Sequence, residues 1–300
     1  MSAVRASQDM AGRVCLVTGA TDGHGRAVAG QLARRGAELV LLGRNPEKCR
    51  RVQAEIGAEL AAAGSPGKSP DILICDLSSR AEVERAASEY LASGRPLHVL
   101  VNNAGLVNLH RQESPDGHEL TFAVNHLSLF QLTLRLVPRL QQSAPARIVN
   151  VSSDSYRVGK LDLDDLALEK YSVSNSYARS KLAILYFTLE LAKRLEASGD
   201  SRVTVNAVDP GPVASNIGAN NPGLLYTLAK PMIKYLFPSA DRAARTAMLL
   251  ATDPALSART GGYYRSMKHR EKPLDFDPKL SERLWRISAE LTGADLPSSS

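Results

Sequence analysis

Residues 18–25 read Thr18-Gly19-Ala20-Thr21-Asp22-Gly23-His24-Gly25, and they join an expected strand, Arg13–Gly19, to an expected helix from about Arg26 to Arg35. Glycine tolerates a positive φ and lets the backbone approach a ligand closely. The first turn of the following helix offers free N–H groups and the positive end of the helix dipole, which together suit a pyrophosphate. The spacing TGxxxGxG between a strand and a helix therefore predicts a dinucleotide-binding loop.

Short apolar runs and amphipathic stretches alternate along the rest of the chain. Further runs of strand length are Ala37–Gly43, Asp71–Asp76, Leu97–Asn102, Arg147–Ser152 and Arg202–Val208. Nearly continuous apolar runs are typical of parallel strands that are covered on both faces. Strands that alternate with helices predict an α/β fold, a doubly wound parallel sheet of the Rossmann type with about seven strands and helices on both faces. We expect a single domain over residues 1–300, with its core at 12–265 and a C-terminal extension at 266–300.

Several helix starts are recognisable. Ser79 and Glu82 have the spacing of a capping box. Ser114-Pro115 and Asp277-Pro278 each combine an N-cap residue with proline at the first helical position. A long amphipathic stretch rich in helix-forming residues predicts a further helix over Tyr177–Leu195.

Composition fits a soluble globular protein, with 44% hydrophobic and 23% charged residues. The formal charge is +6, but Lys and Arg form no long basic block, so we predict no nucleic-acid partner. Cys15, Cys49 and Cys75 are scattered and have no metal-like spacing, which favours reduced thiols and no catalytic metal. The first twelve residues contain no apolar run, so the cytoplasm is the expected location.

A series of motifs accompanies the glycine loop. In chain order they are Asp76-Leu77, Asn102-Asn103-Ala104-Gly105, Asn125, Ser152-Ser153, Tyr177-x-x-x-Lys181 and Pro210-Gly211. With this set, the sequence from about Arg13 to Tyr264 resembles the classical short-chain dehydrogenase/reductase family. The long Asp154–Ser176 segment, expected to be an inserted loop, and the C-terminal run Leu284–Ser288 resemble its retinol-dehydrogenase-like group. The resemblance implies an enzyme that interconverts an alcohol and a carbonyl by hydride transfer with a nicotinamide cofactor.

The Tyr-x-x-x-Lys pattern alone does not identify the catalytic tyrosine. It occurs four times, at Tyr156/Lys160, Tyr177/Lys181, Tyr226/Lys230 and Tyr264/Lys268. Tyr177 opens a predicted helix between the fifth and sixth strands, where a lysine one turn later lies on the same face and favours the phenolate. Tyr156 is the main alternative, although Gly159 and its place directly after the fifth strand indicate a loop. Tyr226 lies in an apolar flap-like segment, and Tyr264 is expected past the last strand.

The resemblance implies a role for each residue of the catalytic group. Tyr177 is the general acid in reduction and, as the phenolate, the base in oxidation. Lys181 lowers the pKa of Tyr177 and binds the nicotinamide ribose. Ser153 polarises the substrate oxygen, with Ser152 as the alternative hydroxyl. Asn125 supports a water beside Lys181, the alternative being a buried polar residue that stabilises its helix.

The tip of the second strand bears on the choice of cofactor. It reads Leu42-Gly43-Arg44-Asn45 and lacks the acidic residue that binds ribose hydroxyls in NAD-dependent relatives. An arginine there suits the 2′-phosphate of NADP. The alternative is an ordinary solvated arginine. We predict NADP(H).

The resemblance also implies the cofactor-binding set. Asp76 would bond the adenine, Asn103 would lie beside the adenosine ribose, and Ser215 would meet the carboxamide. His24 replaces the aliphatic residue that relatives usually have. The residues expected to bind the cofactor are Gly19, Thr21, Asp22, Gly23, His24, Gly25, Arg44, Asn45, Asp76, Leu77, Asn103, Ala104, Gly105, Tyr177, Lys181, Pro210, Gly211, Val213 and Ser215.

Residues 222–237 correspond to the variable substrate flap of the family. The segment is apolar and aromatic, which favours a lipophilic alcohol or carbonyl substrate. Alternatives are that it contacts a membrane surface or that it only covers the core. Two other functions are open: an NADP(H)-binding sensor or scaffold with little turnover, and a nucleotide-sugar epimerase, which usually needs a longer C-terminal domain. Relatives often form homo-oligomers, but the sequence does not fix an oligomeric state.

Overall fold

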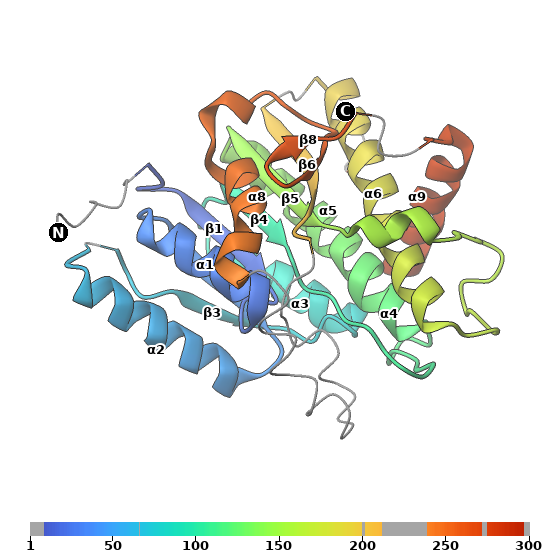
Figure 1. The fold of residues 1–300 in the computed structure, drawn as a ribbon, viewed down its shortest axis with the longest axis horizontal. Helices are drawn as coiled ribbons and strands as arrows, with labels where there is room; N and C mark the ends of the chain where they lie inside the picture. The colour runs from blue at the N-terminus through green and yellow to red at the C-terminus, as the bar shows by residue number, and fades with distance from the viewer. Residues whose placement is uncertain (1–8, 66, 200–201, 212–238, 272–274, 297–300) are drawn as a thin grey trace.

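The computed structural model describes residues 9–65, 67–199, 202–211, 239–271 and 275–296. Its centre is an eight-stranded sheet in the order β3-β2-β1-β4-β5-β6-β7-β8 (Figure 1). The strands are β1 (Val14–Thr18), β2 (Glu38–Gly43), β3 (Asp71–Ile74), β4 (Val99–Asn102), β5 (Ala146–Val151), β6 (Val203–Asp209), β7 (Tyr263–Arg265) and β8 (Lys268–His269). The pairs from β3 to β7 are parallel, and β8 is antiparallel to β7. The predicted doubly wound parallel sheet is confirmed.

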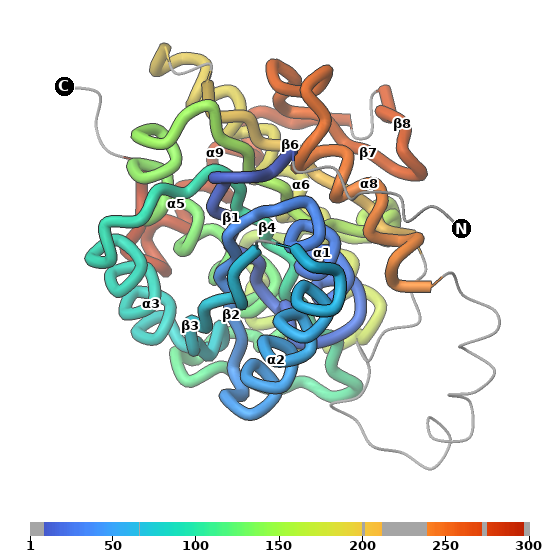
Figure 2. The backbone as a smooth tube through the Cα atoms, turned by 90° about the vertical axis from the view of Figure 1, so that its left-hand side faces the viewer, coloured from blue at the N-terminus to red at the C-terminus, as the bar shows by residue number. Residues whose placement is uncertain are grey.

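Helices cover both faces of this sheet. They are α1 (Gly23–Arg34), α2 (Pro46–Ala62), α3 (Arg80–Ala92), α4 (Leu120–Phe122), α5 (Ser128–Gln142), α6 (Val173–Ala197), α8 (Ala240–Thr252) and α9 (Pro278–Thr292), with short helical segments η1 (Ala123–Leu127), η2 (Asp154–Val158) and η3 (Pro254–Leu256). One apolar core lies between the sheet and α1, α2 and α8, and another lies between the sheet and α3, α5 and α6. Figure 2 shows α1 and α2 on one side of the molecule and α3 and α5 on the other.

Alternation along β1 explains why a core forms on each face of the sheet. Cys15 and Val17 face α1, α2 and α8, whereas Leu16 faces the opposite core, and all three side chains are fully buried. Burial of each large apolar side chain contributes about 1.5–3 kcal/mol, so a strand with apolar residues on both sides requires cover on both faces. The parallel arrangement brings the carboxyl ends of β1, β4, β5 and β6 to one edge of the sheet.

Buried amides tie the central strands to the helices behind them. The Asn102 side chain donates to Thr133 Oγ1 (2.8 Å) on α5 and to Asn150 Oδ1 (2.9 Å) on β5. Asn150 in turn donates to Thr188 Oγ1 on α6 (2.9 Å). Since an unpaired buried amide is costly, these bonds fix α5 and α6 against the ends of β4 and β5.

The helix after β4 starts later than its sequence suggests. The prediction that Ser114-Pro115 begins a helix is wrong, because residues 114–118 form a turn in which Gly117 has φ +80°. Glu119 is the actual cap, and its carboxylate accepts from the backbone N–H groups of Thr121 (2.9 Å) and Phe122 (3.0 Å). A carboxylate at the positive end of a helix is a stronger cap than a serine hydroxyl.

Helices α4 and α5 are joined through a π-helical turn, η1, which carries Asn125. The whole stretch Leu120–Gln142 is long and apolar enough to cross a membrane by length and composition, yet 89% of its most apolar window is buried inside the fold. Its apolar character is therefore accounted for by packing between the sheet and its neighbours. π-Helical turns occur often at functional sites, and this one faces the carboxyl edge of the sheet.

The C-terminal region adds two elements. Asp277 caps α9 as predicted, and Pro278 opens that helix. Trp285 of α9 packs against Phe130 and Phe187, so α9 lies on the outer side of α5 and α6. The prediction that Tyr264 lies past the last strand is wrong, because it belongs to β7 and pairs across a tight turn with β8.

Candidate active site

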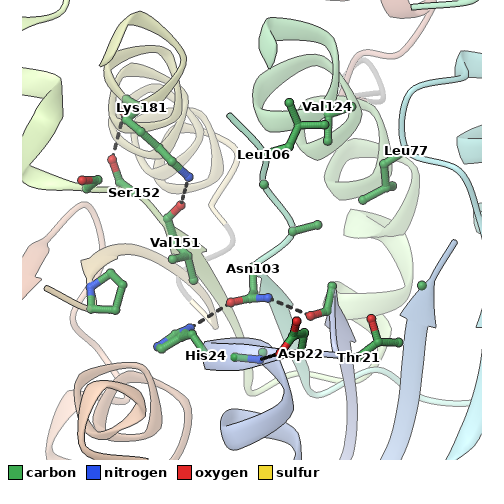
Figure 3. Close-up of a pocket in the computed structure, with 18 of the residues that line it drawn as sticks. Thr21, Asp22, His24, Leu77, Asn103, Leu106, Val124, Val151, Ser152 and Lys181 are labelled. Carbon is green, nitrogen blue, oxygen red and sulfur yellow. Dashed lines mark hydrogen bonds between the residues drawn. The ribbon is translucent and has the colours of Figure 1, made fainter. Parts of the chain in front are cut away.

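A cavity of about 580 Å³ opens at the carboxyl edge of the sheet. Its walls come from the ends of β1, β2, β4, β5, β6 and β7 and from the start of α6. The strand order reverses between β1 and β4, and crevices at such points are where doubly wound sheets bind their ligands. Figure 3 shows part of the lining, with Asn103 and His24 near the glycine loop and the side chain of Lys181 extending from α6 into the site.

The glycine loop has the backbone geometry that the sequence predicts. Gly19 and Gly23 have positive φ values of +63° and +48°. A Cβ atom at Gly25 would overlap the carbonyl oxygen of Gly19 and the side-chain amide of Asn103. Asp22 caps α1, whose N-terminal turn borders the cavity. A glycine-rich loop in front of a helix N-terminus fits a pyrophosphate.

Asn103 connects the loop to the end of β4. Its backbone N–H donates to Thr18 Oγ1 (2.9 Å), and its side-chain amide donates to the Thr18 carbonyl (2.8 Å). The Oδ1 atom of Asn103 lies 2.8 Å from His24 Nδ1. Because the Asn103 oxygen is an acceptor, neutral His24 donates from Nδ1, and burial lowers the pKa of its imidazole. His24 thus fixes the loop through Asn103.

The far end of the cavity carries Arg44 and Asp76. The Arg44 side chain is 65% exposed, and its Nη1 lies 4.0 Å from Asp76 Oδ2. The other Asp76 oxygen accepts from the backbone N–H (2.9 Å) and the hydroxyl (2.8 Å) of Ser78. Arg44 is therefore held only weakly and is free to turn toward an anion. Asn45 does not line the cavity, because its side chain caps α2 by accepting from Lys48 N–H (2.8 Å).

Ser153, Tyr177 and Lys181 meet at the other end of the cavity. The side chains of Ser153 and Tyr177 are hydrogen bonded, and Lys181 Nζ lies 5.4 Å from the centre of the Tyr177 ring. Lys181 Nζ also donates to the Val151 carbonyl (3.0 Å). Ser152 is turned away, since its hydroxyl donates to the Lys181 carbonyl on α6 (2.9 Å) (Figure 3). The geometry favours Ser153 over Ser152 as the reactive hydroxyl.

Asn125 lies behind this group and does not line the cavity. Its Oδ1 accepts from Leu106 N–H (2.8 Å), and its amide donates to the Leu106 carbonyl (3.1 Å) and to Ser180 Oγ (3.0 Å). A Cβ atom at Gly105 would lie 3.3 Å from Asn125 Oδ1 and 3.4 Å from Lys181 Nζ. A side chain at position 105 would therefore be in close contact with both Asn125 and the lysine.

Burial sets the charge states of the proposed catalytic pair. It raises the pKa of Tyr177 to about 12, against the lowering effect of the Ser153 hydrogen bond and together with the nearby Asp209 carboxylate. Burial also lowers the pKa of Lys181 to about 8, and Asp209 opposes that change. In the protein alone, Tyr177 is thus a protonated phenol at neutral pH and Lys181 is mainly an ammonium ion.

A buried ion pair that sequence reasoning missed positions α6. Arg179 Nη2 lies 3.1 Å from Glu119 Oε2, and both side chains are almost completely buried. Arg179 also donates to the carbonyls of Asp165 (3.0 Å) and Leu166 (2.9 Å), in the long segment before α6. The pair therefore joins the start of α4 and that segment to the helix that carries Tyr177. The sequence held one signal of this ion pair: Arg179 lies on the apolar face of the helix predicted over Tyr177–Leu195, where a charged side chain needs a partner.

Comparison with known proteins identifies the family. The short chain dehydrogenase family matches residues 13–222. The chain belongs to this family. Retinol dehydrogenase 12 of Mus musculus is 38% identical over 94% of this chain and 87% of its own length, and polyprenol dehydrogenase of Mus musculus is 39% identical over 94% and 84%. A short chain dehydrogenase from Escherichia coli CFT073 complexed with NADPH superposes with a TM-score of 0.67 at 25% identity, over 87% of this chain and 100% of its own.

These relatives place the chain in the retinol-dehydrogenase-like subgroup of the family. They support an oxidoreductase that interconverts alcohols and carbonyl compounds. Most residues of the predicted cofactor set line the cavity. Val213, Ser215, the flap at 222–237 and the Tyr226/Lys230 pair lie outside the described residues. Lining residues not anticipated are Leu42, Gly43, Cys75, Leu106, Val124, Val151, Asp154, Asp209 and Arg265. Among the residues the structure describes, no cluster suited to a metal ion occurs.

Replacing Arg179 with methionine should strongly destabilise the fold. The Arg179→Met change leaves the Glu119 carboxylate buried and unpaired, which costs about 3–5 kcal/mol in the free energy of unfolding. Urea unfolding at neutral pH measures the loss, and Arg179→Met/Glu119→Gln should recover part of it. Arg85→Met is the control, since its pair with Glu82 is exposed and is expected to contribute at most about 1 kcal/mol. If Arg179→Met and Arg85→Met lowered the free energy of unfolding equally, the conclusion that the Arg179–Glu119 pair positions α6 would be contradicted.

Proposed function

We propose that this short-chain dehydrogenase is an NADP(H)-dependent enzyme that interconverts a lipophilic alcohol and its ketone or aldehyde. The observation that carries the proposal is the meeting of Ser153, Tyr177 and Lys181 at one end of a cavity whose other end holds the glycine loop and Arg44. A nucleotide cofactor fits the loop end, and proton transfer fits the tyrosine end. Neither feature alone would separate an oxidoreductase from a nucleotide-binding protein.

The chain's own residues handle the proton. A bound nicotinamide supplies the hydride in reduction and accepts it in oxidation. In reduction, the Tyr177 hydroxyl gives its proton to the substrate oxygen, which gains a negative charge as the carbonyl carbon gains the hydride. Ser153 donates a hydrogen bond to that oxygen, and the positive charge of Lys181 stabilises the phenolate that remains. Oxidation is the reverse, with the Tyr177 phenolate as the base.

A lipophilic substrate is supported by the relatives and by the cavity wall. The relatives' names specify retinol and polyprenol, both long apolar alcohols. In this chain Leu106, Val124 and Val151 supply apolar surface to the wall of the cavity. We assign further substrate contact to residues 222–237, on the basis of their apolar sequence. A cytoplasmic location is part of the proposal, supported by Cys15, Cys49 and Cys75, which are all buried free thiols.

Turnover should depend on the Tyr177 hydroxyl. We expect NADPH consumption, followed by absorbance, with members of a panel of retinal, long-chain aldehydes and aromatic ketones. Tyr177→Phe should lower kcat by about 100-fold or more, because it removes the proton donor and leaves the ring. Tyr171→Phe is the matched control, since its hydroxyl donates to the Asn108 carbonyl outside the cavity, and it should keep the activity.

Other outcomes would change this assignment. Loss of activity in Tyr156→Phe with full activity in Tyr177→Phe would transfer the acid role to Tyr156. Tight NADPH binding without turnover of any compound in the panel or in a metabolite extract would favour the alternative, an NADP(H)-binding sensor or scaffold.

The choice between NADP(H) and NAD(H) should depend on Arg44. We expect the wild type to bind NADPH more tightly than NADH, because Arg44 forms charge-assisted hydrogen bonds with the 2′-phosphate. Arg44→Asp should reduce this preference by about 10- to 100-fold, since such bonds are worth about 1.5–3 kcal/mol. Fluorescence titration with both cofactors measures the ratio. Arg50→Asp makes the same charge change on the exposed side of α2 and should leave the preference nearly unchanged. A wild type that prefers NADH would refute the proposal.

A further inference from the structure

Arg265 lies between two carboxylates at the wall of the cavity. It is the last residue of β7 and pairs in register with Asp209, the last residue of β6. The Nε atom of Arg265 lies 3.2 Å from Asp209 Oδ2, and its Nη1 forms an ion pair with Asp154 Oδ2. All three residues line the cavity, and the Arg265 side chain is about one-third exposed. One guanidinium therefore bridges two separate strand ends.

Each carboxylate adjoins a segment of the proposed site. Asp154 directly follows Ser153, and it also accepts from the Tyr263 hydroxyl (3.2 Å) and pairs with Arg157 (3.2 Å). Asp209 directly precedes Pro210-Gly211 and accepts from the Gly211 N–H (2.8 Å). Through Arg265, the segment with the reactive serine is held beside the segment expected to meet the nicotinamide. A planar guanidinium with several fixed donors is suited to such a bridge, whereas an ammonium is not.

The same three residues contribute charge to the wall of the cavity that Tyr177 also lines, and the carboxylate of Asp209 raises the pKa of Tyr177. On its own helix Tyr177 faces Lys181, and across the cavity lie Asp154 after β5, Asp209 on β6 and Arg265 on β7. The two carboxylates are balanced by the Lys181 ammonium and the Arg265 guanidinium, with the exposed Arg157 at the edge. Asp209 is 4% exposed, and Arg265 opposes the rise in its pKa that burial causes. Without Arg265, Asp154 would keep the exposed Arg157 as an ion-pair partner, but the buried Asp209 would lose the guanidinium that pairs with it, and the charge beside Tyr177 would become more negative.

We propose that Arg265 is a positioning residue for proton transfer: it holds the Ser153 and Pro210-Gly211 segments together and balances the two carboxylates beside Tyr177. The inference rests on the proposed function, because it concerns the proton that Tyr177 exchanges. A merely structural ion pair at the sheet edge would affect stability but would leave the titration of the active site unchanged.

The pH profile of alcohol oxidation separates these two roles. Arg265→Met removes the positive charge and keeps an apolar stem. Negative charge disfavours the phenolate, so the acidic limb of the kcat profile should move to higher pH by about 0.5–1 unit. On that limb, kcat at a fixed pH should fall about 3- to 10-fold. Asp154→Asn in the Arg265→Met background restores the charge balance and should return the limb toward its wild-type position.

Two further variants separate charge from geometry. Arg265→Lys keeps the charge but can bridge the carboxylates less well, so the limb should stay in place while the plateau of kcat falls. Arg283→Met is the control, because it removes an arginine that pairs with Asp164 on the surface, and its profile should match the wild type. If Arg265→Met does not fold, Asp154→Asn alone provides the test, since removal of one carboxylate should move the limb to lower pH.

The outcomes distinguish this inference from the proposed function. If the wild type shows no turnover that Tyr177→Phe abolishes, the proposed function fails before any Arg265 variant is measured. If that turnover is present and the limb moves by less than about 0.2 units in Arg265→Met, or in Asp154→Asn where the former does not fold, the assignment of Arg265 is overturned. Binding of NADP⁺, followed by fluorescence, shows in each variant whether the cofactor site is intact.

Discussion

Lys181 is buried and Tyr177 lies beside it in the cavity wall, and much of the surrounding structure follows from the cost of holding these two titratable groups away from water. Burial raises the pKa of the phenol to about 12 and lowers the pKa of the ammonium to about 8. A charged lysine in the interior needs partners, which here are the Val151 carbonyl and the Asp209 carboxylate. Asp209 is itself buried, and Arg265 pairs with it. The charges in this region are thus coupled from α6 across the sheet to β7.

Helix α6 must be held firmly for this arrangement to persist. It is fixed at its start by Arg179 and Glu119 and further along by Thr188, which accepts from Asn150 on β5. Across the cavity, Asn103 binds the glycine loop to the end of β4. The loop and the tyrosine are therefore attached to neighbouring strands of one sheet, and the sheet determines their separation.

Local signals in the sequence were sufficient for strands β1 to β6 of the sheet and for most of the residues that line the cavity. Apolar runs identified six strands, and strand–glycine–helix spacing identified the loop, because both patterns report the chemistry of adjacent residues. Capping was less reliable: Ser79 and Asp277 cap helices, but Ser114 does not, since Glu119 competes as a charged cap. Strand β8 has two residues and no periodicity to detect. The bridge from Arg265 to Asp154 spans 111 residues, and only the three-dimensional fold brings the two together.

The central claim is that Tyr177 exchanges a proton at this site, and its ionisation can be observed without a substrate. The measurement is the tyrosinate absorbance of the NADP⁺ complex as a function of pH, taken as the difference between the wild type and Tyr177→Phe. Because the ammonium of Lys181 and a bound cofactor both favour the phenolate, the account predicts one tyrosine that ionises well below the value of about 12 set by burial. A difference curve with no ionisation below pH 11 would contradict it.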